Sequence, residues 1–513
     1  MADVPSYARF VLRGYSPWPA EKIVRMVDAG TGVAQIPGDF VAIAEGTCDG
    51  QAYTRIVTSM VAALPYYFTP GRGTQGPFEH GPTVFDVVRR ARLSWRWNRR
   101  AISFLALLGH TVGDDTLHPD VFRVPNAAVI TAMGGRLGRI ERQDDAWRSV
   151  FAPTSVTDPQ SAVATLRDVF GEMTTPARAV LSLSAGYDSR LLLALLLSLG
   201  ERPLAITAGF ADSTDVVVAG MIARALGLEH RIVELDPNDY LKHARDIVHA
   251  TSGTKTAAHW HTDLYVRAAG IARDDVHYVG SNGEFARSYY LDRGAFAHAL
   301  GVGPRALMEA FFAAKLTRRA RRLPPALLAG GPGPLACARH LTSLVQPFTR
   351  SFADALDCFY ATQRVRHFIG NGLALYTQHS QPRSPFLDAR WIRAVGGLPR
   401  RERLGSNHHR RAIATLLPDL LAFPTGGGGP MARRAPPLYY VVKDKSVGYS
   451  PFDRVIRDSR VHEIIAEASA LDEIVPRAAR VAEARRSGIA SELLLTLAFA
   501  SELGSEAAAS GAS

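Results

Sequence analysis

A short polar segment near residue 184 has the residue types and spacing of a phosphate-binding turn. Ser184, Gly186, Asp188 and Ser189 form an S-x-G-x-D-S pattern directly after an apolar run. A glycine lets the backbone approach an anion closely, and hydroxyls together with the N–H groups of a helix start bind phosphate. Asp188 would repel phosphate, so it is better suited to cap the helix or to contact magnesium. The pattern predicts a phosphate and magnesium site, with an ordinary capped strand–helix turn as the alternative.

This segment is neither of the two common phosphate-binding motifs. The sequence contains no GxxxxGK[ST] Walker loop, and the segment is not GxGxxG.

Two pairs of histidines are further candidates for a functional role. His259 and His261 could belong to a metal site, but without a third ligand nearby in the sequence they are better read as part of a polar wall. His408 and His409 lie in a basic stretch, which predicts a solvated or phosphate-facing surface.

The elements around the polar segment predict a parallel sheet. It follows an apolar β-type run at 179–184 and precedes an apolar helix at 190–199 that ends at Gly200. Further strands are expected at 203–208, 231–235 and 276–280, and further helices at 161–172, 216–226 and 238–250. Alternation of this kind is typical of an α/β fold with helices on both faces of the sheet. Ligands bind at the carboxyl edge of such sheets, where this segment lies.

The rest of the chain divides around this region. Residues 1–155 predict an α+β domain, with short strands at 40–44, 53–57, 128–131 and 137–141 and helices at 84–92 and 100–108. A polar, turn-rich stretch at 153–160 marks the boundary, and the second domain spans 156–500, mostly helical after about 290. The small polar residues 501–513 predict a disordered tail, and the glycines at 426–429 predict a loop.

Several motifs in the second domain resemble the asparagine synthetase family, a group of N-type ATP pyrophosphatases with a PP-loop. The family's S-G-G-x-D-S is matched at 184–189, with Ala185 in place of the middle glycine. The segment 206–210 resembles the strand that contacts adenine, and Asp215 matches the acid that opens the next helix. The segment 280–290 resembles the family's G-x-G-x-D-E followed by G-Y, with Glu284 for the aspartate and Phe285 where the second acid stands. The segment 383–388 is close to R-x-P-F-L-D.

The first domain resembles the family more faintly. Residues 38–44, 64–67 and 114–125 are similar, in order, to three strand and loop motifs of the family's glutaminase domain. The resemblance therefore implies a PP-loop synthetase domain preceded by a truncated Ntn-hydrolase-like domain. It also implies ATP and Mg²⁺ as cofactors, with Asp188 and Glu284 at the metal. The residues that would bind the nucleotide are Ser184, Gly186, Asp188, Ser189, Thr207, Gly280, Glu284 and Arg287.

Two departures from the family pattern bear on activity. The family's glutaminase uses a cysteine at position 2, and this chain has Ala2 there on a strand expected to be truncated, so glutamine hydrolysis is not expected. The family's R-x-K lysine is also missing after the basic helix. Arg410 keeps the arginine of that region, and Lys443 or Lys445 could replace the lysine from the following loop. Arg410 and Lys443 are therefore the predicted catalytic residues.

Composition limits the remaining functions. The chain has 513 residues, 47% hydrophobic and 21% charged, and its net charge of +11 comes from 53 arginines and only six lysines. No lysine block or basic tail favours nucleic-acid binding, and no long apolar run predicts a membrane span. Three scattered cysteines exclude a disulfide framework. The sequence predicts a cytoplasmic protein that acts on small-molecule or peptide carboxylates and amines, and it leaves a homodimer open.

The resulting hypothesis is an ATP-dependent amide-forming ligase. It would adenylate a substrate carboxylate, release pyrophosphate, and pass the acyl group to an amine with release of AMP. β-Lactam synthetases and lasso-peptide cyclases are relatives without the glutaminase cysteine, so a peptide macrocyclase is an alternative within the same class. A nucleotide-binding scaffold without activity is the alternative from a different class.

Overall fold

The computed structural model describes residues 5–71, 77–211, 213–234, 236, 238–291, 304–349, 351–425, 455 and 458–512. The predicted catalytic Lys443, its alternative Lys445 and the glycine loop at 426–429 lie outside these residues. No described helix is both long enough and apolar enough to span a membrane.

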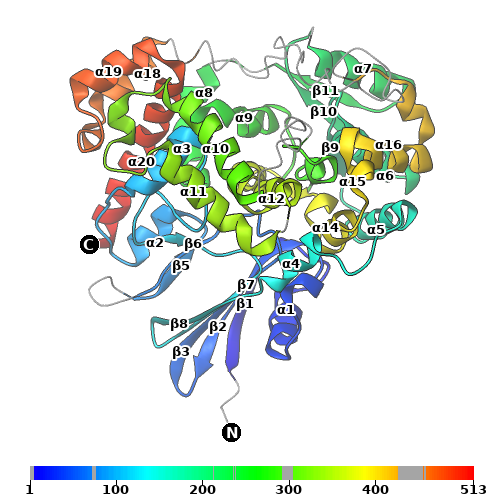
Figure 1. Cartoon of the computed structure of the whole chain (residues 1–513), viewed down its shortest axis with the longest axis horizontal. Coiled ribbons are helices and arrows are strands. Elements are labelled where there is room, and N and C mark those ends of the chain that lie inside the picture. The colour runs from blue at the N-terminus through cyan, green and yellow to red at the C-terminus, as the bar shows by residue number, and fades with distance from the viewer. Residues whose placement is uncertain are drawn as a thin grey trace.

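The first 150 residues are built on an antiparallel sheet (Figure 1). Its order is β1-β2-β3-β7-β8, and the strands are β1 (Ser6–Tyr15), β2 (Asp39–Cys48), β3 (Gln51–Thr58), β7 (Ala128–Met133) and β8 (Arg136–Arg142). A small sheet has the order β5-β4-β6 and consists of β4 (Tyr67–Thr69), β5 (Glu79–Gly81) and β6 (Phe122–Arg123). Ala2, on the strand expected to be truncated, lies outside the described residues, and the described β1 begins at Ser6 and pairs with β2.

Four helices accompany these sheets, namely α1 (Ala20–Asp28), α2 (Val84–Arg90), α3 (Arg99–Leu108) and α4 (Asp145–Phe151). The amphipathic α1 buries Ile23, Val24 and Val27. α3 begins at Asn98, whose side chain accepts hydrogen bonds from the first-turn N–H groups, and ends at Gly109 in the left-handed conformation.

The second region is built on a five-stranded parallel sheet. Its order is β11-β10-β9-β12-β13, and the strands are β9 (Ala179–Ser182), β10 (Leu204–Ala208), β11 (His230–Val233), β12 (Val276–Tyr278) and β13 (Gln381–Arg383). The helices between its strands include α6 (Tyr187–Ser198), α7 (Thr214–Leu226), α8 (Asn238–Thr251) and α9 (His261–Ala268), and α5 (Pro159–Gly171) precedes β9. The chain runs outward from β9 to β11 and then returns to place β12 on the other side of β9. This reversal makes the carboxyl ends of β9 and β12 the point where α/β sheets bind ligands.

The remaining described residues are mainly helical, as expected after residue 290. They include α10 (Pro304–Ala320), α11 (Pro334–Val345), α12 (Phe352–Phe359), a π-helix (Tyr360–Ile369), α13 (Gly370–Tyr376), α14 (Ala389–Gly396), α15 (Arg400–Arg403), α16 (Asn407–Leu416), α18 (Ser459–Glu467), α19 (Arg477–Arg486) and α20 (Gly488–Ala512). α16 packs directly against α6, the helix that follows the polar turn.

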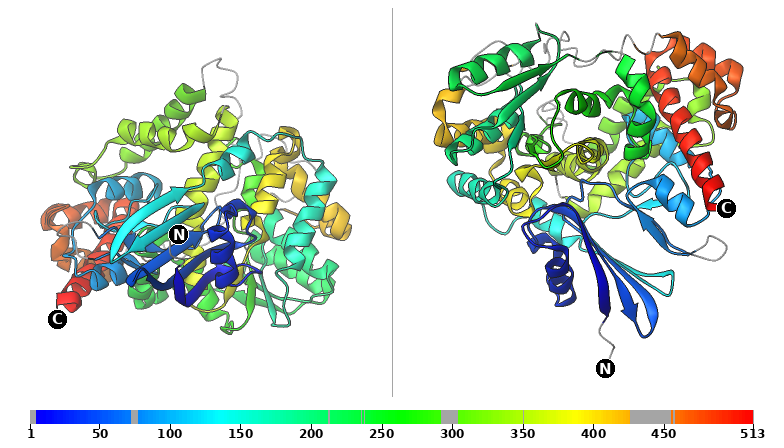
Figure 2. Two further views of the ribbon diagram at one scale, coloured as in Figure 1. Left: turned by 90° about the horizontal axis from the view of Figure 1, so that it is seen from below. Right: turned by 180° about the vertical axis from the view of Figure 1, so that it is seen from behind.

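The prediction of a disordered tail after residue 500 is wrong. α20 continues through this segment and packs against α2, so the C-terminal helix lies beside a helix of the first 150 residues in Figures 1 and 2. The physical reason is the small residues themselves. A Cβ atom on Gly504 would lie 2.1 Å from the Trp95 ring, so the glycine lets the helix backbone approach an aromatic side chain.

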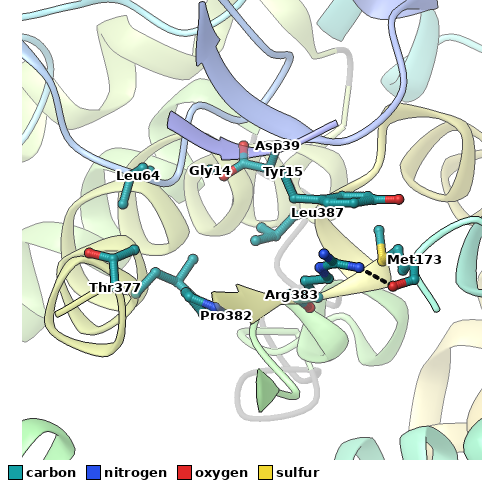
Figure 3. A pocket seen from close by; sticks show the side chains of 11 residues that line it. Gly14, Tyr15, Asp39, Leu64, Met173, Thr377, Pro382, Arg383 and Leu387 are labelled. Atoms are coloured by element: carbon teal, nitrogen blue, oxygen red, sulfur yellow. Dashed lines mark hydrogen bonds between the residues drawn. The ribbon is translucent and has the colours of Figure 1, made fainter. Parts of the chain in front are cut away.

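The antiparallel sheet packs closely against the edge of the parallel sheet. Between β1, β2 and β13 lies a cavity of about 30 Å³, with Tyr15 and Arg383 on one wall (Figure 3). The Arg383 guanidinium lies 4.5 Å from the centre of the Tyr15 ring and donates to the carbonyl of Met173. A cavity of this size holds water rather than a nucleotide, which directs attention to the carboxyl ends of β9 and β12.

Candidate functional site

The predicted phosphate loop lies between β9 and α6, at the switch point of the sheet. Gly186 is the N-cap residue of α6, and no side chain caps this helix. The first-turn N–H groups of a helix have no intrahelical partners, and the helix dipole makes this end positive. The free end of α6 therefore suits an anion such as pyrophosphate.

Internal hydrogen bonds hold the loop in shape. The Ser184 N–H donates to Ser189 Oγ over 3.1 Å, and the Gly186 N–H donates to Ser184 Oγ over 3.1 Å. The two serine hydroxyls lie 3.0 Å apart. Asp215, at the start of α7, accepts a 2.8 Å hydrogen bond from the Ala185 N–H. Since these amides already have partners, the amides of the first α6 turn are the ones free to bind a ligand.

Two glycines bring the second predicted segment onto Asp188. A Cβ atom on Gly280 would lie 2.9 Å from the Asp188 Cβ, and one on Gly283 would lie 2.3 Å from Asp188 Oδ1. No larger residue fits at Gly283 without moving the aspartate. The intervening Asn282 has a φ of 75°, and its amide donates to the Phe386 carbonyl. The structure therefore joins the segments at 184–189 and 280–287, which are almost 100 residues apart, into one site.

Arg287 links the two predicted metal ligands. Its Nη2 lies 2.8 Å from Asp188 Oδ2 and 3.7 Å from Glu284 Oε1. The hydroxyl of Tyr360, the first residue of the π-helix, donates a 2.7 Å hydrogen bond to Glu284 Oε2. Burial and the adjacent carboxylate raise the pKa of Tyr360 well above its usual value, so the hydroxyl stays protonated as a donor.

His409 completes the surroundings of Asp188. Its Nε2 lies 2.8 Å from Asp188 Oδ1, on the opposite oxygen from Arg287. Burial by itself would raise the pKa of Asp188, but Arg287 and His409 more than compensate and hold it below the usual value. Asp188 is therefore an ionised carboxylate whose charge is balanced by its neighbours, which removes the expected repulsion of phosphate.

Of the two surfaces predicted for His408 and His409, the solvated one is wrong, and the phosphate-facing one stays a prediction. Both side chains are fully buried, because α16 packs its histidine face against α6 and the end of the 383–388 segment. His408 lies near the Trp391 ring, and burial lowers its pKa to about 3. The sequence contained the residue types but no sign of which face of α16 is buried.

Two other residues predicted for the site, Thr207 and Arg410, make their side-chain hydrogen bonds to groups other than Asp188 and Glu284. Thr207 is 3% exposed, and its hydroxyl lies between the Leu183 carbonyl (2.8 Å) and His230 Nε2 (2.9 Å), so its side chain is engaged with the sheet. Arg410 is on α16 beside His409, and its guanidinium donates to Asn407. Neither side chain has a contact with Asp188 or Glu284 among the interactions of the described residues.

A buried charge cluster supports the Glu284 segment from behind. Asp357, 1% exposed, forms an ion pair of 2.8 Å with Arg403 and another with Arg400. Arg403 Nη2 also donates to the Phe285 carbonyl over 3.0 Å, and Arg400 Nη1 donates to Ser288 Oγ over 2.8 Å. Phe285 and Ser288, the residues that directly follow Glu284 and Arg287, are thus held by the same cluster.

The segment that resembles R-x-P-F-L-D has a connecting role. Ser384 Oγ donates to the Ser281 carbonyl over 2.7 Å, next to Gly280. Asp388, fully buried, accepts a 2.8 Å hydrogen bond from the Gly38 N–H, just before β2. This motif therefore joins the candidate site to the antiparallel sheet.

The residues present fit a nucleotide phosphate better than a metal alone. In the described residues no group of three or more histidine, cysteine, aspartate or glutamate side chains is placed to hold a metal ion. His259 and His261, whose ring centres are 6.2 Å apart, lack a third ligand there. Mg²⁺ commonly takes one or two carboxylates and completes its shell with water and phosphate oxygens, which matches Asp188 and Glu284 next to the free end of α6.

Comparison with known proteins agrees with this geometry. Residues 169–280 match the model of the asparagine synthase family. The match spans the polar loop, the first four strands of the parallel sheet and Gly280. It supports the assignment of this segment to the ATP-utilising asparagine synthetase family and its α/β synthetase fold. The glutaminase-like resemblance of the first domain stays a prediction. No curated protein matches the chain significantly.

Proposed function

We propose that the protein is an ATP-dependent ligase that forms an amide through an acyl-adenylate. A substrate carboxylate oxygen attacks the α-phosphorus of ATP, and pyrophosphate leaves. An amine then attacks the acyl carbon, loses a proton, and displaces AMP. One observation carries this proposal. The uncapped N-terminus of α6 lies next to the cluster of Asp188, Arg287 and Glu284 at the switch point of the parallel sheet.

Each residue has a role set by its place. The N–H groups of the first α6 turn and the Ser184 hydroxyl bind the pyrophosphate part of the nucleotide. Arg287 offsets the negative charge that grows on the leaving group, and Tyr360 orients Glu284 through its 2.7 Å hydrogen bond. Asp188 and Glu284 would hold Mg²⁺, which supplies charge neutralisation of the phosphates. Positioning and charge stabilisation account for most of the expected catalysis.

The amine is proposed to come from the substrate rather than from glutamine. What supports this is the resemblance, in which Ala2 stands at the position of the nucleophilic cysteine of the family's glutaminase domain. A small-molecule or peptide amine fits this loss. A macrocyclase, in which amine and carboxylate belong to one peptide, is a special case of the same chemistry.

Exchange of labelled pyrophosphate into ATP tests the adenylation step. We expect exchange that depends on a carboxylate drawn from a panel of amino acids and linear peptides. Asp188→Asn should reduce it at least about 100-fold, because the change removes a charge at the reacting phosphates. Glu229→Gln, at a carboxylate with a 61% exposed side chain, is the matched control and should retain full exchange. Equal activity of Asp188→Asn and wild type would exclude this mechanism.

A nucleotide-binding scaffold is the second candidate. Phe285 occupies the place of the family's second acid and is 1% exposed in the core, and both oxygens of Asp188 already face cationic or histidine nitrogens. Calorimetry with Mg-ATP separates the two functions. Tight ATP binding with no exchange and no AMP release across the panel would favour the scaffold.

A further inference from the structure

A strongly cationic pocket lies beside the candidate site. It has a volume of about 210 Å³ and is lined by Lys315, Arg318, Arg319, Arg322 and Arg364 together with Tyr290. The other lining residues are three aliphatic side chains and His110, and no aspartate or glutamate is among them. Burial lowers the pKa of His110 to about 3, so this histidine is neutral.

The last part of α10 and the turn after it bring four of these cations to one pocket. Lys315, Arg318 and Arg319 are spaced i, i+3 and i+4 on α10, and Arg322 lies in the turn that follows the end of the helix at Ala320. Cations at a helix C-terminus are favoured by the dipole, which is the ordinary explanation for such a cluster. Arg319 Nε donates to the Ala106 carbonyl over 2.7 Å and has Glu492 nearby, and Lys315 Nζ lies 4.7 Å from the centre of the Tyr290 ring. Arg318 and Arg322 are exposed side chains that also line the hollow.

Arg364 closes the pocket from the opposite side. Its guanidinium lies 4.4 Å from the Phe368 ring centre and 5.2 Å from that of Tyr289. Its buried Nε has no hydrogen-bond partner among the described residues. Burial opposes the charge, but the surrounding tyrosines and Glu284 raise the pKa of Arg364 above its usual value. A permanent charge with an unused buried donor at the pocket wall points to a ligand that is an acceptor.

The pocket adjoins the Asp188–Glu284 site through two tyrosines. Tyr360, which donates to Glu284, has its ring centre 6.3 Å from that of Tyr290 and 5.2 Å from that of Tyr289. Tyr290 itself lines the pocket. A single layer of aromatic side chains therefore separates the cationic pocket from Glu284.

We propose that this pocket binds a negatively charged group of the substrate that reacts at the Asp188–Glu284 site. The group is an oxyanion, a carboxylate or a phosphate, in addition to the group that reacts. The inference rests on the proposed ligase function. Pockets for whole drug-sized ligands start near 300 Å³, so this one takes one end of a substrate, and its aliphatic floor accommodates the carbon chain next to the charge.

Direct binding of simple probes tests the pocket without ATP. Benzoate and phenyl phosphate carry the two candidate anions on the same ring, and benzamide is the neutral match of benzoate. We expect calorimetry to detect one or both anions but not benzamide, with affinity that falls as salt rises. Arg318→Gln/Arg322→Gln should weaken binding of the anion at least about 10-fold. The tighter of the two probes identifies the class of oxyanion.

The control variant also removes two positive charges, from arginines in the same part of the chain. Arg305 and Arg321 are exposed and do not line the pocket, so Arg305→Gln/Arg321→Gln should change binding less than about 2-fold. Equal losses in both double variants, or no binding of either anion to wild type, would overturn the inference. All four arginines are away from the α6 terminus, and Mg-ATP affinity should be the same in wild type and both variants.

Exchange activity separates failure of the pocket from failure of the ligase function. With wild type, acids that bear a second anionic group should support exchange better than matched acids without it. In Arg318→Gln/Arg322→Gln this preference should disappear while the slow exchange with the simpler acids persists. A preference that survives in the pocket variant overturns the inference and leaves the ligase function standing. Salt-sensitive probe binding without exchange for any acid rejects the ligase function while the anion site remains.

Discussion

Asp188 shows how neighbouring side chains set the state of a single residue in the candidate site. A carboxylate at the start of a helix meant for an anion is unfavourable by itself, yet Arg287 and His409 hold it ionised and balanced. Phe285 shows the opposite case. Where the related sequences have a second acid, this chain places an aromatic ring in the core beside Trp391, with Arg403 4.7 Å from the ring centre. The departure is therefore a packing feature of this chain.

Restoring the acid should damage the fold. Phe285→Asp would bury a carboxylate in a site shaped for an aromatic ring. We expect the free energy of unfolding to decrease by roughly 3–5 kcal/mol and the Tm to fall with it. Phe285→Leu, which keeps the site apolar, should lose much less. Thermal unfolding followed by circular dichroism measures both. A Phe285→Asp protein with unchanged Tm and increased pyrophosphate exchange would show that the acid still belongs to the site.

At the scale of elements, tight contacts at glycines position the helices. Gly283 allows the 283–287 turn to close over Asp188, and Gly504 allows α20 to lie on Trp95. Gly220, in the middle of α7, has only ordinary contacts around it, the nearest being His230 at 3.9 Å. The same residue type is therefore essential at two helical or turn positions and dispensable at a third.

Alanine substitutions should separate these cases. Gly220→Ala should raise Tm, because alanine favours a helix by up to about 1 kcal/mol over glycine. Gly504→Ala should lower Tm despite the same gain, since its Cβ would lie 2.1 Å from the Trp95 ring. Differential scanning calorimetry gives both values. If Gly504→Ala were as stabilising as Gly220→Ala, the packing of α20 against Trp95 would be incorrect.

On the scale of the whole molecule, polar groups are buried throughout the core. His110, His277 and His408 are at most 1% exposed, and burial lowers the pKa of each to about 3. Each is neutral in the folded protein and titrates near pH 6.5 when unfolded. Between pH 6.5 and about 3 the unfolded chain binds protons that the folded chain does not, so stability decreases as the pH falls through this window.

Acidification should therefore lower Tm steadily below pH 6.5. At pH 5 each of these histidines contributes a loss of about 2 kcal/mol relative to pH 7. His408→Phe, which packs a ring against Trp391 without titrating, should show a smaller decrease of Tm between pH 7 and pH 5. Thermal scans at half-unit pH steps provide the comparison. An identical decrease in the variant would mean that His408 is already charged in the folded state.

Much of the parallel sheet could be predicted from local patterns. β9 to β12 and the helices α6, α7 and α8 lie within a few residues of their predicted ranges, because apolar strands and helix periodicity are local properties. The helix α9 was not predicted. No strand was predicted at the observed range of β1, Ser6–Tyr15. β13 was not predicted either, because its three residues Gln381–Arg383 carry no strand pattern and pair only because β12 lies beside them. The prediction of a disordered tail at 501–513 was wrong because the contact of Gly504 with Trp95 connects residues about 400 positions apart.

The sequence by itself determined the chemistry available to this protein: a phosphate-type turn at 184–189, the acids Asp188 and Glu284, and the strand–helix order that places the turn at a sheet edge. Only the tertiary structure decided which groups surround them. Contacts between distant segments bring Arg287, His409 and Tyr360 to these acids. They also bring the cations within 315–322 and Arg364 to the lining of one pocket. The physical reason is that residue type and periodicity are set along the chain, whereas charge balance and burial depend on which helix faces pack together.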